Sequence, residues 1–313
     1  MTAEYEVIVV GSGAGGATLA RELGKRGVSV LVVETGVREQ QVGRFREAVG
    51  YYDASKLLKT PRTSEEGVIL WRTLMAGGST VVSAGNAIRA DERGLREHGI
   101  DLTDEYAEAE AEMGVEPVDE ALLSEASRRL RDAAADLGYA FEPMPKFVDQ
   151  EQCRRCGHCT LGCMAEAKWT ALDYLDEAVQ YGVDVRYAAE VREVLVEDGT
   201  AVGVRGVDRD GTFEVRADTV VLAAGALATP RILQQSGVEA GDGLFVDLFV
   251  NVYGVTPELV NQQAEPQMAL LADAFHDEGF LLSPYLNVPR EVRFIEAGVR
   301  GAVLPLPARS ASW

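Results

Sequence analysis

Lysine is scarce in this chain of 313 residues. Only five lysines stand among its 30 basic residues, against 50 acidic ones, and the formal net charge is −20. A surface this acidic repels phosphate and no long basic run offsets the repulsion, so the composition excludes a nucleic-acid partner. The acidic residues are spread between apolar segments, which predicts a folded, acid-coated surface typical of a salt-rich, halophilic cell. A merely acidic protein of ordinary salinity is the alternative.

Long apolar runs and a basic leader are missing as well. No segment reaches the roughly 18 apolar residues that a membrane helix needs. The start, MTAEYEVIVVGSG, runs into an apolar strand without a signal-type segment. The four cysteines all fall between positions 153 and 163, which is not the spacing of a secreted disulfide scaffold. We therefore expect a cytoplasmic protein with no membrane partner.

The first 34 residues carry the pattern of a βαβ dinucleotide-binding unit. Its expected elements are a buried strand over 5–10, a helix over 14–25 and a second strand over 28–33. Gly11 permits the sharp turn, Gly13 lets the backbone approach a pyrophosphate, and Gly16 lets the helix pack closely on the strand. Ala14 opens the helix, whose N-terminal N–H groups attract phosphate. Glu34 can accept hydrogen bonds from a ribose diol. The pattern does not decide whether the dinucleotide is FAD or NAD.

Two later segments resemble signatures of the glucose–methanol–choline (GMC) family of flavin oxidoreductases. Residues 72–80, RTLMAGGST, resemble the Gly-Gly-Ser-Ser segment that touches the flavin ring, and residues 219–237 resemble the second family signature. Glu34-Thr35-Gly36 matches the family's acid-x-Gly. The resemblance covers residues 5–240 and implies FAD as the cofactor. The further FAD contacts that it implies are Gly77, Gly78, Ser79, Thr80, Val191, Ala224 and Gly225.

The resemblance also implies a fold class and a division into domains. We expect an α/β fold, with a Rossmann-like FAD-binding domain of parallel sheet and β-meander and a partial α+β substrate domain. The expected domains are an FAD-binding domain over 1–90 and 165–240, a helical, cysteine-rich insertion over 91–164 and an incomplete substrate-binding domain over 241–313. Within them the apolar pattern predicts one packed helix over 119–137 and a strand over 243–255.

The activity that the family implies is oxidation of a CH–OH group in a small alcohol or sugar-like donor, by hydride transfer to FAD. The sequence does not identify the electron acceptor that reoxidises the flavin. In the family a C-terminal His serves as the base, and His98, His158 and His276 lack that setting, so the catalytic residue is unknown. We therefore expect a C-terminally truncated chain or one completed by a second chain. An electron-transfer flavoprotein subunit and an inactive FAD-binding remnant are the alternatives.

The four cysteines form the run Cys153-x2-Cys156-x2-Cys159-x3-Cys163, which has the spacing of a bacterial ferredoxin iron–sulfur run. The basic residues around it are Arg154, Arg155, His158 and Lys168. Their charge is expected to lower the pKa values of the thiols and to offset an anionic cluster. The run therefore predicts a [4Fe-4S] site, with zinc, free thiols or a structural loop as alternatives. It also resembles the cysteine segment of GMC proteins similar to long-chain alcohol oxidases.

Overall fold

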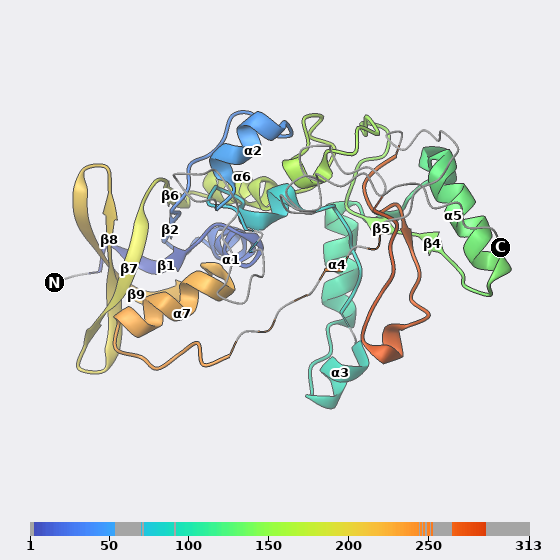
Figure 1. Ribbon diagram of the computed structural model, residues 1–313. Helices are drawn as coiled ribbons and strands as arrows, with labels where there is room; N and C mark the ends of the chain where they lie inside the picture. The colour runs from blue at the N-terminus through green and yellow to red at the C-terminus, as the bar shows by residue number, and fades with distance from the viewer. Residues whose placement is uncertain are drawn as a thin grey trace, which may run out of the picture.

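The computed structural model describes residues 3–53, 70, 72–90, 92–243, 245, 247, 249–250, 252 and 265–285. The strand expected over 243–255 and most of the expected substrate-binding domain lie outside these residues. The described part is built around one six-stranded sheet (Figure 1).

Four strands of this sheet run parallel, and two more complete an antiparallel meander. In spatial order they are β6 (Asp184–Arg186), β2 (Val30–Val33), β1 (Tyr5–Val10), β9 (Gly211–Leu222), β8 (Thr200–Asp208) and β7 (Glu190–Glu197). β9 belongs to both parts, because its second half pairs in parallel with β1 and its first half pairs antiparallel with β8. The predicted parallel sheet and β-meander are confirmed.

β1 is buried on both faces because its side chains alternate between two cores. Ile8 packs in a cluster that includes Ile232 of α7 (Gly225–Gln235). Val9 packs in a second cluster, formed with α1 (Ala14–Lys25) and α6 (Ala171–Gln180). Both side chains are fully buried, and each such burial stabilises the fold by roughly 1.5–3 kcal/mol. A nearly continuous apolar strand is what a parallel sheet covered on both faces requires.

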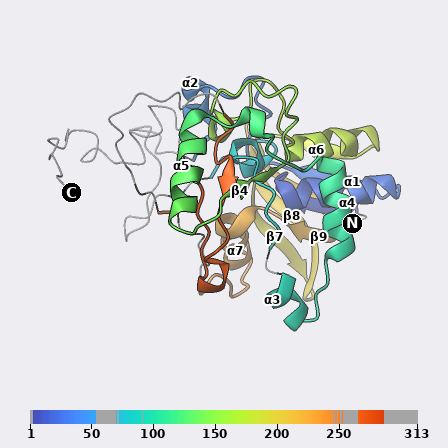
Figure 2. The same cartoon turned by 90° about the vertical axis from the view of Figure 1, so that its right-hand side faces the viewer.

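The other helices and strands of the described chain are joined by long loops. They are α2 (Phe45–Tyr51), η1 (Gly78–Val82), α3 (Glu92–Glu97), α4 (Thr103–Met113), β3 (Glu116–Pro117), η2 (Glu120–Leu122), α5 (Glu125–Asp136), β4 (Glu142–Pro143), β5 (Pro145–Lys146), η3 (Cys159–Leu161), β10 (Leu270–Leu271) and η4 (His276–Glu278). β3 pairs with β5, and β4 pairs with β10. In Figure 1, α3, α4 and α5 lie across the parallel strands from the meander, and Figure 2 shows them in front of the sheet.

The prediction of one packed helix over 119–137 is wrong. The chain forms η2 and then breaks, and α5 begins anew because Ser124 caps it by accepting the N–H of Ser127 at 3.2 Å. Glu265, far along the chain, fixes this break by accepting from Ser124 N and Ser127 Oγ, both at 2.7 Å. At the other end of the predicted helix Leu137 is 76% exposed, so the segment is not packed along its whole length.

A buried arginine joins α4 to the dinucleotide-binding unit. Arg21 of α1 donates to both carboxylate oxygens of Glu112 in α4, at 2.7 and 2.9 Å, and to Glu177 in α6 at 2.7 Å. Tyr174 of α6 donates to Glu112 at 2.6 Å and lies under the guanidinium. The hydrogen bonds from Arg21 and then Tyr174 lower the pKa of Glu112 to about 2. The position of α4 therefore depends on one ionised carboxylate.

Glu112→Gln is expected to destabilise the protein by roughly 1–2 kcal/mol at neutral pH, because it removes the charged partner of Arg21. The pKa of Glu112 is depressed on folding, so its contribution is complete above about pH 4.5 and is lost as the pH falls toward 2. Thermal unfolding of both proteins across this range would show the difference shrinking with acid. A difference that stays constant down to pH 2 would contradict this role.

Candidate cofactor-binding site

The glycine-rich turn after β1 closes so tightly that two of its glycines leave no room for a side chain. Gly11 has φ +99°, and a Cβ there would lie 2.6 Å from the carbonyl oxygen of Ala223. A Cβ on Gly16 would lie 1.9 Å from the carbonyl oxygen of Gly11. The backbone at Gly13 instead faces open space, and α1 begins at Ala14 with no acidic residue in its first turn. The N–H groups of this turn are therefore suited to a pyrophosphate.

One buried carboxylate connects the glycine-rich turn to the segments that follow β2 and precede η1. Glu34 accepts from the N–H and the hydroxyl of Ser12, at 2.9 and 2.7 Å, and from the N–H of Gly36 at 2.7 Å. The Ser12 hydroxyl in turn accepts from the N–H of Gly77 at 3.2 Å. Three donors occupy most of the roughly four acceptor positions of a carboxylate. Glu34 is thus held in one orientation and keeps about one position for a ribose hydroxyl.

The segment expected to touch the flavin lies directly against the glycine-rich turn. Gly77 and Gly78 both have positive φ, +81° and +56°, and a Cβ on Gly78 would lie 3.0 Å from the Cα of Gly13. η1 starts at Gly78 and carries the exposed Ser79. Thr80 fixes the turn, since its hydroxyl donates to Gly77 O at 2.6 Å and accepts from Ala171 N at 2.9 Å. The structure therefore brings two motifs together that are far apart in the sequence.

The remaining predicted contacts follow the carboxyl end of β9 or lie in β7. Ala224 precedes α7, and Gly225 opens it with φ +82°. The strand before them ends beside the glycine-rich turn, because Ala223 N donates to Val10 O at 2.8 Å. Val191 is buried in β7, two residues after Ala189, whose N–H donates to Glu34 O at 3.0 Å. Ligands of open α/β sheets bind at this edge.

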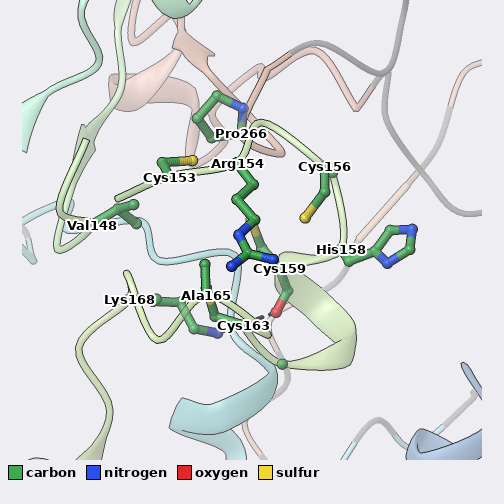
Figure 3. Close-up of a pocket in the computed structure, with 12 residues that line it drawn as sticks. Val148, Cys153, Arg154, Cys156, His158, Cys159, Cys163, Ala165, Lys168 and Pro266 are labelled. Atoms are coloured by element: carbon green, nitrogen blue, oxygen red, sulfur yellow. Dashed lines mark hydrogen bonds between the residues drawn. The ribbon is translucent and has the colours of Figure 1, made fainter. Parts of the chain in front are cut away.

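The four cysteines line one small cavity of about 20 Å³ (Figure 3). All four are unpaired thiols, and Cys156 is the exposed one. The predicted lowering of thiol pKa values is wrong for two of them, because loss of water around the sulfur raises the pKa of Cys153 and also of Cys156, whose residue is otherwise exposed. In the chain as far as it is described, no three Cys, His, Asp or Glu groups converge closely enough to hold a metal ion as they stand. Figure 3 shows Arg154 extending between the cysteines.

One buried lysine, Lys168, lines this cavity, and a second, Lys146, is buried beside the segment that follows the flavin turn. Lys168 Nζ donates to the carbonyl oxygens of Val81 (2.8 Å), Ser83 (2.6 Å) and Cys159 (3.1 Å). Lys146 Nζ donates to Ala84 O at 3.0 Å and to the amide oxygen of Asn86 at 2.5 Å. Burial lowers the pKa of each ammonium to about 8. Lys168 therefore ties the end of η1 to the start of η3.

The histidines are not assembled into a catalytic group in the part of the chain that is described. His98 sits at the end of α3, with its Nδ1 2.8 Å from Gly94 O. His158 contacts Gly43 O through Nδ1 at 3.1 Å, and His276 belongs to the exposed turn η4.

Sequence reasoning missed Ser12 and Lys146, and it placed Lys168 near the cysteines without predicting that its ammonium is buried. Ser12 occupies a variable position of the glycine motif, and its side chain is fully buried. For the lysines a signal was present, since a chain that supplies most of its cations as arginine places lysine at only five positions. Two of the three lysines that the structure describes are buried.

A parallel sheet with this turn, this acid and a second glycine segment folded against the turn defines a Rossmann-type dinucleotide-binding protein. The family model described as GMC oxidoreductase matches residues 5–252. The chain belongs to the GMC oxidoreductase family, whose members bind FAD. This confirms the predicted family. Separately, none of the helices in the described residues is long and apolar enough to cross a membrane.

The similar proteins include enzymes from distant organisms. An uncharacterized GMC-type oxidoreductase of Mycobacterium tuberculosis is 33% identical over 88% of this chain and 43% of its own length. A long-chain-alcohol oxidase of Arabidopsis thaliana is 26% identical over 82% of this chain and 38% of its own. The crystal structure of pyridoxine 4-oxidase from Mesorbium loti matches the fold with a TM-score of 0.57 at 19% identity, over 75% of this chain and 52% of that one. The chain thus spans less than half the length of these two sequence relatives.

Gly16→Ala is expected to weaken FAD binding roughly tenfold or more, because the new methyl group would collide with the Gly11 carbonyl and open the turn. Gly15→Ala is the matched control, one residue earlier on the same helix, where a Cβ meets nothing within 4 Å. The measurement is FAD per chain after gel filtration, with a Kd from flavin fluorescence. Equal FAD affinity in the two variants would show that the turn does not bind the cofactor.

Proposed function

We propose that this chain forms the FAD-binding part of an oxidoreductase that takes a hydride from the CH–OH carbon of a small alcohol or sugar-like donor. The observation that carries the proposal is the hydrogen-bond chain from Glu34 through Ser12 to Gly77, which unites the three cofactor segments. Among the relatives, a long-chain-alcohol oxidase supports an alcohol as the donor. The relatives that are named as oxidases give less support to an electron-transfer subunit or an inactive remnant.

Each segment has a distinct task in this proposal. The N-terminus of α1 at Gly13 and Ala14 would hold the pyrophosphate, Glu34 a ribose diol, and the backbone at Val191 the adenine. Gly77 to Thr80, with Ala224 and Gly225, would position the ring system, which supplies the hydride-accepting chemistry when FAD is bound. The FAD-binding domain would comprise 1–90 and 165–240, with 91–164 as the insertion that positions the cysteines and 241–313 contributing to the substrate side.

We further propose that the protein works in the cytoplasm of a salt-rich cell. The net charge of −20 and the preference for arginine over lysine support this. Many of the surface ion pairs in the described residues use arginine, such as Arg89 with Glu110 and Arg205 with Glu214. Concentrated KCl is therefore the medium for the experiments below.

As a second cofactor we propose a [4Fe-4S] cluster on Cys153, Cys156, Cys159 and Cys163. The ferredoxin-like spacing and the shared cavity support it. The donor set fits such a cluster chemically, although the four sulfurs do not converge as they stand. Loading would require the cysteine side chains to turn inward and the exposed side chain of Arg154 to leave the cavity.

The test of alcohol oxidation is anaerobic reduction of the bound flavin. The protein, purified in concentrated KCl, is mixed with primary alcohols of increasing chain length and with sugars while the oxidised-flavin absorbance is followed. We expect at least one alcohol to bleach the flavin, with the Gly16→Ala protein as the control whose FAD binding is weakened. FAD retained at full occupancy but not reduced by any donor would overturn the proposed activity for this chain and favour the remnant.

The cluster has its own measurement, which does not depend on turnover. Iron and acid-labile sulfide are determined in the anaerobically purified protein, and we expect about four of each per chain. Cys159→Ser should lose both and keep FAD. An FAD-loaded protein with neither iron nor sulfide would remove the [4Fe-4S] assignment while leaving the flavin proposal untouched.

A further inference from the structure

Residues 77–83, the flavin turn, are held at their start by the segment that leads into α6. Thr80 Oγ1 accepts from Ala171 N at 2.9 Å and donates to Gly77 O at 2.6 Å. Leu172 packs so closely against the turn that a Cβ on Gly77 would lie 2.9 Å from its Cγ. A hydrogen bond and a packing contact from one short segment therefore fix the part of the turn that is expected to touch the ring.

Lys168, in the same segment, holds the other end of the flavin turn with its ammonium. Nζ donates to Val81 O at 2.8 Å and to Ser83 O at 2.6 Å. A third hydrogen bond reaches Cys159 O in η3 at 3.1 Å (Figure 3). An ammonium has three donors, so these carbonyls use all of them. The side chain is 5% exposed, and its buried ammonium is thus held in one position.

A buried lysine is a costly way to satisfy neutral acceptors. Removing an ammonium from water is unfavourable unless an anion compensates it, as Glu112 and Glu177 do for Arg21. Within the described ranges the three acceptors of Lys168 are all carbonyl oxygens. The charge makes each of these hydrogen bonds roughly twice as strong as a neutral one. The carbonyls at the end of a helical turn otherwise lack a donor, so the ammonium gives this end a single stable arrangement.

The segment that carries Lys168 is itself held in place by the core. Thr170 caps α6 through a capping box with Asp173, whose Oδ2 accepts from Thr170 N at 2.7 Å. Ala171, the first residue of α6, is fully buried in the cluster that includes Ala17 of α1. The glycine-rich turn precedes α1 and the flavin turn is held from the start of α6. One pair of packed helices therefore positions both turns.

We propose that Lys168 is a positioning residue for the flavin: its ammonium fixes the end of the turn whose start, at Gly77 and Gly78, contacts the ring. The inference rests on the flavin contact proposed above for residues 77–80 and adds the group that orders it. Without the ammonium, Val81 O and Ser83 O would lose their donor, and the turn would open toward water. Binding FAD would then have to order the turn first, which weakens the affinity.

The same ammonium is placed to favour the reduced cofactor. η1 has five residues, and at about 2 Å per residue its two ends lie about 8 Å apart. The positive charge of Lys168 is therefore close to the residues that would hold the ring, in a buried setting where solvent screens it less than at the surface. Because hydride transfer adds negative charge to the ring, this cation should raise the reduction potential of the flavin.

The experiment compares Lys168→Met and Lys168→Arg with Lys146→Met, at pH 7 in concentrated KCl. Lys146 is the matched control, because it is 1% exposed and its ammonium donates to Ala84 O and the amide of Asn86, beyond the flavin turn. Amide hydrogen exchange over 77–83 is measured on each full-length protein without FAD. The Kd for FAD is then obtained from flavin fluorescence, and the midpoint potential is measured on the FAD-loaded protein.

Lys168→Met is expected to speed exchange in the flavin turn and to weaken FAD binding, each about tenfold or more. Lys146→Met should change both by less than about twofold, because its contacts lie outside the turn. The midpoint potential of Lys168→Met should fall by about 30 mV, a tenfold change for two electrons. Lys168→Arg keeps the charge, but its planar fork fits three converging carbonyls poorly. Its potential should therefore stay near that of the native protein while its FAD affinity falls.

The positioning role is overturned if Lys168→Met keeps native FAD affinity and native exchange over 77–83. It is also overturned if exchange rises equally along the whole chain, because that would show a general loss of stability. An unchanged potential would overturn the effect of the charge. If Lys168→Met does not fold, Lys168→Arg decides, and native exchange and FAD affinity in that variant would contradict the role. None of these readouts needs an alcohol donor, so their failure is distinct from a failure of the proposed oxidase activity.

Discussion

The cofactor site depends on the hydroxyl of Ser12. It donates to Glu34, which is 22 residues away in the sequence, and accepts from Gly77, which is 65 residues away. A displacement of the glycine-rich turn therefore displaces the acid for the ribose and the turn for the flavin as well. Hydrogen bonds of this kind hold the three segments in place within the protein itself, which lowers the ordering cost of binding a large dinucleotide.

The sequence predicted the N-terminal unit closely because local rules determine it. The strand over 5–10 and the helix over 14–25 have the predicted bounds, and the second strand is shorter by two residues at its start. The helix over 119–137 failed for the opposite reason. Its break at Ser124 depends on Glu265, 141 residues away, and no local pattern records that contact. Ser12 was overlooked in the same way, because its role depends on Glu34 and Gly77.

The cysteine run shows what spacing can and cannot reveal. The positions of the four thiols predicted that they would share a site, and they do line one cavity. The electrostatics around them could not be inferred from neighbouring charges, because burial opposes those charges at Cys153 and Cys156. An ammonium is compact and has three freely oriented donors, so at position 168 it meets three carbonyls that a planar guanidinium would fit poorly.

β9 pairs both with β1 in the parallel part of the sheet and with β8 in the meander, which affects the order of folding during synthesis. β7, β8 and the first half of β9 are near neighbours in sequence and can pair as soon as they leave the ribosome. β1 pairs with the second half of β9, and Tyr5 and Ala217 are more than 200 residues apart. β1 can pair with β2 early, but at typical elongation rates it waits roughly 10 to 40 s for this second partner. Until then one edge of β1 stays unpaired in the emerging chain, and the mutual repulsion of the chain's acidic residues opposes association of that edge with other chains.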